Sequence, residues 1–180
     1  MDNGHFIEDT VMTNTEIKAR AQDWRRQQEI ALELSGQAGQ VLNQEDTYFF
    51  VKHGLLKMRF EEQSASAVLI FYERNDLCGP KLCRYTLLLI AKPDAIILKN
   101  ILAEVCGVAA VVRKTRILYM VDRCRIHFDQ VDNLGRFIEI ELVHGNLDSG
   151  NSEIMSVEEI MLRLDIRQED LIEGSYADLL

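Results

Sequence analysis

Proline, paired cysteines and long apolar runs are all scarce in this chain. Two of its 180 residues are proline, so the composition is far from that of collagen-like or proline-rich disordered chains. The four cysteines form no CxxC pair, and a chain of this length can bury a core without disulfides. We therefore expect reduced thiols, and the cysteine spacing argues against a structural zinc site.

No stretch of the sequence is apolar for long enough to span a bilayer. The longest apolar segment, 95–112, is interrupted by Lys99, Asn100 and Glu104. The first ten residues, MDNGHFIEDT, are acidic and lack the apolar region of a secretory signal. These features predict a cytoplasmic protein that has no membrane partner.

Basic residues are outnumbered, since 20 Lys and Arg stand against 29 Asp and Glu and give a formal net charge of −9. Sequence-independent binding to nucleic acid needs a basic face that neutralises phosphates, so we expect no nucleic-acid partner. This argument covers only the outer surface, because an acidic protein can still contain a basic interior cleft. The length predicts one domain, 14–180, after a disordered leader at 1–13.

Patterns of alternation and helical spacing divide the domain into strands and helices. Strands are predicted at 14–20, 44–51, 55–61, 67–74, 81–90, 110–121, 125–131 and 137–144. Helices are predicted after a cap at Asp23 and up to Gly36, at 93–106 and at about 152–164. Mostly hairpin-linked strands with helices after each half predict an antiparallel α+β domain built as two similar halves.

Charged residues recur on one face of these strands. By alternation, that face carries Glu16, Lys18, Arg20, Lys57, Arg59, Lys114, Arg116, Arg125, Asp129, Glu139 and Glu141. One interpretation is the solvated face of an ordinary sheet. The other is an eight-stranded barrel whose polar faces point inward. The mainly basic character of these faces in an acidic protein favours the barrel.

A cationic barrel interior is stable only with a counter-charge, because like charges at low dielectric repel by kilocalories per pair. A triphosphate supplies several negative charges and many acceptor oxygens for Arg and Lys. The carboxylates of Glu16, Glu139 and Glu141 then need a divalent cation between themselves and the phosphates. The sequence thus predicts a site for a triphosphate and a metal ion.

Nine segments, in this order, resemble the CYTH superfamily, which includes class IV adenylate cyclases and thiamine triphosphatase and whose members are also called triphosphate tunnel metalloenzymes. They are TEIKAR (15–20), QEDTYF (44–49), GLLKMRF (54–60), LIFYER (69–74), GPK (79–81), VVRKTRILY (111–119), RIHFDQVDNLG (125–135), FIEIE (137–141) and EGSYADLL (173–180). The resemblance covers nearly the whole chain. It implies an eight-stranded antiparallel β-barrel, the triphosphate tunnel, with helices packed outside.

The ExExK motif of that family falls on Asn14, Glu16 and Lys18, so its first glutamate is missing here. The resemblance implies Mg²⁺ or Mn²⁺ held by Glu16, Glu139 and Glu141. It also implies phosphate-binding cations at Lys18, Arg20, Lys57, Arg59, Arg74, Lys81, Lys114, Arg116 and Arg125. Residues implied in catalysis are Lys18, Lys114, Arg116 and Asp129.

Two departures from the family pattern leave the substrate open. Tyr72 stands where some members have lysine, and Arg74 on the same strand face could supply that charge. Lys81 is followed after one residue by Cys83 and Arg84, where the subgroup often has Ser-Asp. Near the charged face, His127 is either a structural histidine or a general base.

The resemblance implies a hydrolase that releases terminal phosphate from thiamine triphosphate, tripolyphosphate or a nucleoside triphosphate. In this interpretation a water attacks a terminal phosphorus, and positioning and charge neutralisation supply the catalysis. The alternatives are a class IV-type adenylate cyclase and a non-catalytic triphosphate- or polyphosphate-binding module, which Asn14 favours. The sequence leaves open whether the protein is a monomer or a homodimer.

Overall fold

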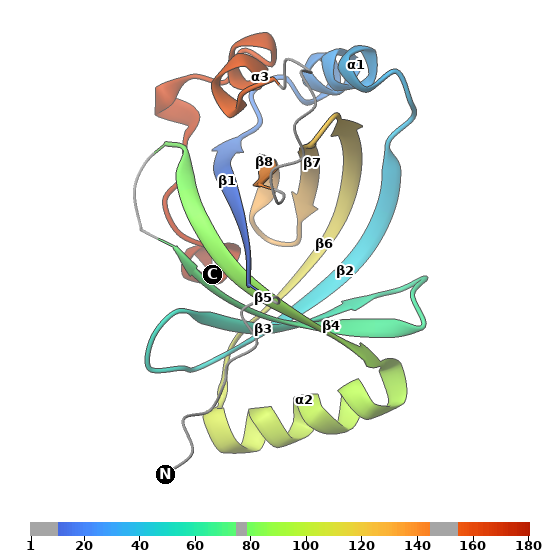
Figure 1. The fold of residues 1–180 in the computed structure, drawn as a ribbon, viewed down its shortest axis with the longest axis vertical. Coiled ribbons are helices and arrows are strands. Elements are labelled where there is room, and N and C mark those ends of the chain that lie inside the picture. The colour runs from blue at the N-terminus through green and yellow to red at the C-terminus, as the bar shows by residue number, and fades with distance from the viewer. Residues whose placement is uncertain (1–10, 75–78, 145–154) are drawn as a thin grey trace.

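Eight antiparallel strands close into a barrel in the order β1-β5-β4-β3-β2-β6-β7-β8 (Figure 1). This computed structural model describes residues 11–74, 79–144 and 155–180, without the side chain of Arg74. The strands are β1 (Val11–Arg20), β2 (Gln40–Phe49), β3 (Leu55–Glu61), β4 (Ser66–Arg74), β5 (Lys81–Ala91), β6 (Val108–Val121), β7 (Cys124–Val131) and β8 (Gly135–His144). The predicted eight-stranded antiparallel barrel with helices outside is confirmed.

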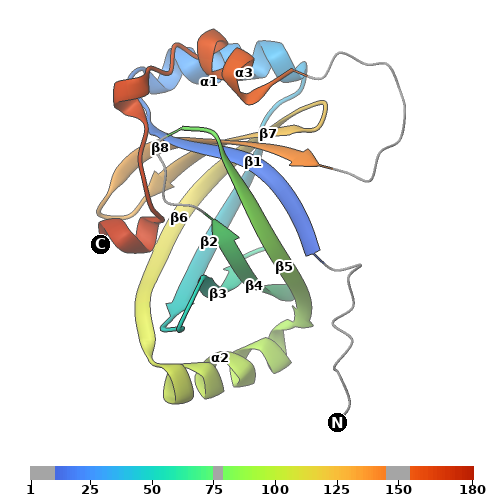
Figure 2. The same ribbon diagram turned by 60° about the vertical axis from the view of Figure 1, so that its left-hand side comes forward.

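Within the described part of the chain, three α-helices pack outside the barrel (Figures 1 and 2). α1 (Trp24–Ser35) and α3 (Val157–Arg163) lie together at one end, and α2 (Lys92–Cys106) lies across the other. Asp23 caps α1, since its side chain accepts a hydrogen bond from the Arg26 backbone N–H, and Gly36 ends α1 in the left-handed conformation, as the sequence predicts. None of the described helices is both long and apolar enough to cross a membrane.

Several boundaries differ from the prediction. β1 begins at Val11, inside the predicted leader, and residues 1–10 of that leader lie outside the described residues. β2 begins at Gln40 because it pairs with the long strand β6 as far as Leu118. α3 begins at Val157, where Ser156 and Glu159 form a capping box, rather than near 152.

The main hydrophobic core lies outside the barrel wall, between the strands and the two helices α1 and α3 (Figure 2). Ile17 on β1, Phe128 on β7 and Ile140 on β8 are at most 1% exposed and belong to the same cluster as Ile160 and Leu164. Because side chains alternate along a strand, burying these residues outward sends their polar neighbours inward. This packing positions the charged faces inside the barrel.

The C-terminal segment returns to the barrel and adds a short 3₁₀ helix, Tyr176–Leu179. The Ile172 backbone N–H donates to the Lys18 carbonyl at 2.8 Å, so the segment is attached to β1. Asp178 accepts hydrogen bonds from the backbone and hydroxyl of Ser175 at 2.6 and 2.7 Å, which fixes the turn before Tyr176. The segment thereby places Ser175 and Tyr176 at the interior of the barrel.

Candidate functional site

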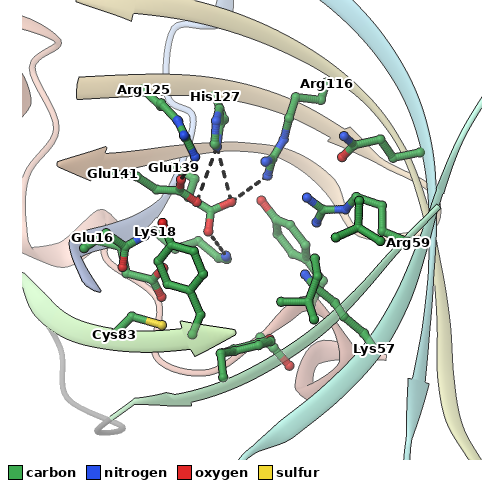
Figure 3. A pocket seen from close by; sticks show the side chains of 18 of the residues that line it. Glu16, Lys18, Lys57, Arg59, Cys83, Arg116, Arg125, His127, Glu139 and Glu141 are labelled. Atoms are coloured by element: carbon green, nitrogen blue, oxygen red, sulfur yellow. Dashed lines mark hydrogen bonds and ion pairs between the residues drawn. The ribbon is translucent and has the colours of Figure 1, made fainter. Parts of the chain in front are cut away.

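A cavity of about 480 Å³ occupies the interior of the barrel, and every strand contributes side chains to its wall (Figure 3). Its size is within the range of small-molecule binding sites. Alternate residues of each strand line it, as on β6, where Lys114, Arg116 and Leu118 do so. The inward-facing alternation predicted from the sequence thus brings charged side chains from several strands to one cavity.

Nine of the predicted site residues line this cavity. They are Glu16, Lys18, Lys57, Arg59, Lys114, Arg116, Arg125, Glu139 and Glu141. Lys18, Lys57, Lys114, Arg116 and Glu139 are each less than 10% exposed. Buried charges of this number need partners, and the structure supplies them in three clusters.

Three other predicted site residues do not line the cavity, and the side chain of Arg74, predicted to bind phosphate, lies outside the described residues. Arg20 is the last residue of β1 and is exposed, with its guanidinium carbon 5.2 Å from the centre of the Phe137 ring. Lys81 is buried opposite Glu16 in the β1–β5 register. Asp129 is fully buried and lies behind the cavity cations. Alternation predicts which face of a strand a side chain lies on. It does not predict whether that face still borders the cavity at the end of the strand.

The first cluster is centred on Asp129. The Arg116 Nε donates to Oδ1 at 2.6 Å and Nη2 to Oδ2 at 2.7 Å, while Lys114 Nζ and the Tyr176 hydroxyl donate to Oδ2 at 3.3 and 2.9 Å. Burial alone would raise the pKa of Asp129, but Arg116 and Lys114 outweigh it and hold that pKa well below its usual range. Asp129 is therefore a fixed counter-charge that orients two cations.

The second cluster is centred on Asp46 of β2, which the sequence analysis did not single out. Arg59 binds it through two hydrogen bonds of 2.7 Å, and Lys57 Nζ lies 3.1 Å from Oδ2. Despite complete burial, which raises the pKa of an acid, Arg59 and Lys57 keep the pKa of Asp46 well below its usual value. Asp46 shares the inward parity of Gln44 and Tyr48, a signal that could have identified it.

Tyr176 is the other functional residue that the sequence analysis missed. Besides its hydrogen bond to Asp129, its ring lies under two ammonium groups, with Lys18 Nζ at 4.2 Å and Lys114 Nζ at 5.1 Å from the ring centre. Contacts of this kind stabilise a buried cation. Only tertiary structure brings the residue there, because it belongs to no strand.

Lys114 is buried close to another cation, Arg116. Burial, and then repulsion from Arg116, lowers the pKa of Lys114 from 10.5 to about 7, although Asp129 opposes this. Keeping the charge on a buried lysine of this kind costs folding free energy. A bound polyanion would offset that cost.

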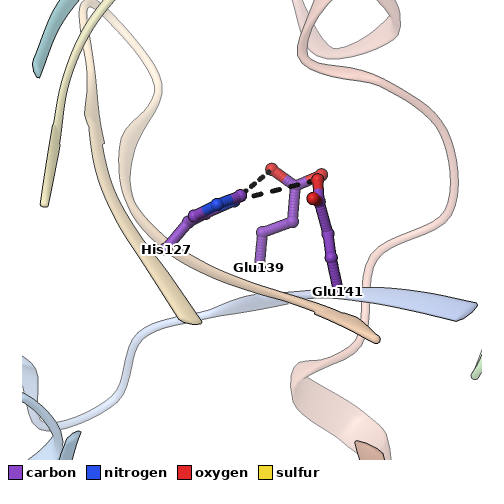
Figure 4. A group of neighbouring side chains, drawn as sticks. All are labelled: His127, Glu139 and Glu141. Atoms are coloured by element: carbon purple, nitrogen blue, oxygen red, sulfur yellow. Dashed lines mark ion pairs between the residues drawn. The ribbon is translucent and has the colours of Figure 1, made fainter. Parts of the chain in front are cut away.

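The third cluster joins acids to a histidine (Figures 3 and 4). Lys18 Nζ lies 3.1 Å from Glu139 Oε1, and Arg116 Nη2 donates to Oε2 at 2.6 Å. Ligand atoms of His127, Glu139 and Glu141 all lie within 4.8 Å of one another. Glu16 faces Glu141 in the β1–β8 register and lines the same cavity, but it is not a member of this group.

This donor set fits a divalent cation. Each carboxylate oxygen has a second lone pair, so the hydrogen bonds from Lys18 and Arg116 leave Glu139 able to coordinate. The side-chain oxygen of Asn14, the position that lacks the motif glutamate, is buried and has no hydrogen-bond partner. Asn14 lines the same cavity as Glu16, Glu139 and Glu141, and an unsatisfied buried oxygen is the kind of atom that an ion or its water satisfies.

A family model for the CYTH domain matches residues 12–176. The chain belongs to the CYTH family. Its members are generally metal-dependent and bind triphosphates. The suspected resemblance is therefore confirmed over nearly the whole chain.

Solved structures share the fold at low sequence identity. The PH1012 protein of Pyrococcus horikoshii superposes with a TM-score of 0.71 at 22% identity, covering 93% of this chain and 99% of its own. HpAC1 of Hippeastrum, a candidate adenylyl cyclase described as having a dominant triphosphatase activity, gives 0.56 at 17%, covering 74% and 80%. A candidate adenylate cyclase of Vibrio parahaemolyticus gives 0.60 at 16%, covering 92% and 96%. Comparison with curated proteins gives no significant match.

Proposed function

We propose that this CYTH protein is a metal-dependent triphosphatase that releases terminal phosphate from a triphosphate. The observation that carries the proposal is the convergence of Lys18, Lys57, Arg59, Lys114 and Arg116 on one cavity, where burial and repulsion from Arg116 lower the pKa of Lys114 to about 7. A triphosphate is a small ligand with the charge and acceptor oxygens to match. The family membership and the likeness to HpAC1 support this choice.

The guanidinium groups would bind phosphate while their carboxylate partners hold them in place. Arg59 uses two of its five N–H donors on Asp46, so three remain for a ligand. Arg116 donates to both Asp129 and Glu139, which fixes its plane. Donors held in advance lose little entropy on binding, and they stabilise charge that develops on the phosphate oxygens during transfer.

Glu139 and Glu141, with Glu16 from the facing strand, would hold Mg²⁺ or Mn²⁺ at one side of the bound phosphates. The ion would neutralise phosphate charge and act as a Lewis acid. Lys18 lies between Glu139 and the Tyr176 ring, where it can contact a phosphate oxygen next to the acidic group. Asp129 would act by holding Lys114 and Arg116, because it is buried behind them.

Two alternatives use the same cavity. A cyclase would bind ATP and release pyrophosphate, in line with the candidate cyclase among the structural neighbours. A binding module would retain the triphosphate unchanged, and Asn14 favours it because an amide contributes an oxygen but no charge to the metal site.

The deciding experiment measures phosphate release from tripolyphosphate, thiamine triphosphate and ATP with Mg²⁺ or Mn²⁺, and follows cyclic AMP with ATP. The test variant is Lys114→Ala with Arg116→Ala. The matched control is Arg113→Ala with Thr115→Ala, which changes the outward face of the same strand. Metal-dependent release that only the test variant loses supports the hydrolase. Cyclic AMP formation supports the cyclase, and tight binding without turnover supports the binding module.

A further inference from the structure

A buried ring nitrogen of His127 faces two carboxylates but forms no hydrogen bond with either (Figure 4). Its side chain is 5% exposed, and Nδ1 lies 3.8 Å from Oε2 of Glu139 and 3.8 Å from Oε1 of Glu141. These distances are too long for hydrogen bonds, and Nδ1 has no other hydrogen-bond partner. A buried polar atom of this kind requires an explanation.

We propose that His127 Nδ1 is a metal ligand, together with Glu139 and Glu141, and that the site therefore prefers Mn²⁺ and later transition ions to Mg²⁺. The proposal rests on the proposed function, since the ion is the one assigned to that site. It adds a nitrogen ligand where sequence analysis predicted glutamates alone.

The geometry fits this role. Ligand atoms bound to one small divalent ion at about 2.1 Å lie about 3 to 4.2 Å from one another, so the two separations of 3.8 Å leave room for an ion between them. Nδ1, which has no hydrogen-bond partner, and the oxygens of Glu139 and Glu141 therefore supply three ligand atoms for one ion.

The ligand chemistry sets the ion preference. Mg²⁺ takes oxygen ligands in near-octahedral geometry and retains several waters. Imidazole nitrogen suits Zn²⁺, Fe²⁺ and other transition ions, whose affinities rise along the series from Mn²⁺. A mixed site of one imidazole and two carboxylates should thus discriminate against Mg²⁺ more strongly than a carboxylate site does.

The test is pulsed electron paramagnetic resonance of Mn²⁺ bound to the protein, alone and with tripolyphosphate. Protein labelled with ¹⁵N-histidine should change the nitrogen coupling of the ion. His127→Gln should abolish the coupling, and His53→Gln, an exposed control, should retain it. Equilibrium titration should show at least a tenfold loss of Mn²⁺ affinity in His127→Gln and a smaller loss for Mg²⁺.

Bound Mn²⁺ without histidine coupling in the unmodified protein would overturn the proposal, and this result needs no variant to fold. An equal loss of Mn²⁺ and Mg²⁺ affinity in a folded His127→Gln protein would refute the ion preference. Neither measurement depends on turnover. A protein that shows the coupling but hydrolyses no triphosphate would keep this inference and reject the triphosphatase.

The cavity wall opposite the cations is uncharged among the described residues. The cavity-lining residues of β4 and β5 that the structure describes are all uncharged: Val68, Ile70, Tyr72, Cys83, Tyr85 and Leu87. In the barrel order, β5 lies across from β6 and β4 across from β7. One side of the cavity is therefore uncharged and largely apolar, and the facing side carries Lys114, Arg116 and Arg125.

From this division we infer that the substrate is an organic triphosphate whose apolar or aromatic group packs on β4 and β5. Tripolyphosphate would place charged oxygens against Ile70 and Leu87, whose own side chains supply no hydrogen-bond donor in place of water. An organic group instead buries apolar surface there. Leu87 is 40% exposed although it lines the cavity, so it retains surface for a ligand to cover.

Equilibrium titration with tripolyphosphate, thiamine triphosphate and ATP tests this inference, with Leu87→Asn beside the outward-facing control Leu88→Asn. At least one organic triphosphate should bind ten times more tightly than tripolyphosphate, and only Leu87→Asn should reduce that ratio. Tightest binding of tripolyphosphate, or an unchanged ratio in Leu87→Asn, would overturn the inference. Binding of none of the three would reject the proposed function as well.

Discussion

Replacing Asp129 by Asn should destabilise the protein strongly. The carboxylate is fully buried and accepts hydrogen bonds from Arg116, Lys114 and Tyr176. Asn keeps the shape but removes the charge, and its amide presents donors to groups that are themselves donors. The variant therefore leaves two buried cations with a single remaining acid, Glu139, on Arg116.

The expected loss follows from the burial of the pair. Removing one partner of a buried ion pair costs about 3–5 kcal/mol, because the remaining charge stays desolvated. For a chain of this size, each kcal/mol corresponds to about 2–4 °C in the melting temperature, so Asp129→Asn should melt about 6–20 °C below the unmodified protein. The matched control is Glu29→Gln, which breaks an exposed pair with Arg25 and should change stability by less than about 1 kcal/mol.

Urea denaturation at several pH values provides the assay. The folded pKa of Asp129 lies below its unfolded value, so the carboxylate stabilises the fold above the unfolded pKa of about 3.9 and loses this effect as pH falls. The gap between Asp129→Asn and the unmodified protein should thus be full at pH 7 and should narrow below about pH 4. A variant as stable as the unmodified protein at pH 7 would refute the ion-pair account and would leave Asp129 free for a direct role on the substrate.

Three further predictions concern the same cavity. Burial and repulsion from Arg116 lower the pKa of Lys114 to about 7, so triphosphate binding at pH 8 should take up about one proton. Calorimetry in buffers of different ionisation enthalpy measures this uptake, which Lys114→Met should remove. Equal binding heats in all buffers would contradict the prediction. Tyr176→Phe removes the hydrogen bond to Asp129 but keeps the ring, so the free energy of unfolding measured with urea should fall by about 1.5–3 kcal/mol. An unchanged urea midpoint would assign the hydroxyl no structural role. Asn14→Glu restores the motif acid and should raise Mn²⁺ affinity at least tenfold, and unchanged affinity would place the ion away from that residue.

Alternation along the strands was enough to place nine of the predicted charged side chains on the faces that line the cavity. Once the core residues Ile17 and Ile140 are assigned to the outside of the barrel, the positions of Lys18 and Glu139 follow from the two-residue period. Alternation does not determine barrel closure, because an open sheet has the same faces. The mainly basic character of the faces favours closure and the family resemblance implies it, and the structure confirms the closed barrel.

The remaining features depend on distances between segments far apart in the chain. Arg59 meets Asp46 because the β2–β3 register places them opposite each other, and a shift by one residue would separate them. Tyr176 meets Asp129 across 47 residues, through a C-terminal segment with no periodic pattern. His127 shares a face with Asp129, but only the three-dimensional structure places its ring nitrogen between two carboxylates.

The distribution of charge also explains how one acidic chain could bind a polyanion selectively. A net charge of −9 repels long polyanions from the outer surface, where nucleic acids would have to bind. Inside the barrel, Asp46 and Asp129 are fully buried behind the cations that they hold, so the groups presented to the cavity are mainly donors. Only an anion small enough to enter the cavity gains those donors, and the enclosed wall makes each contact stronger than it would be in water. Size and charge together therefore favour a small triphosphate over a nucleic acid.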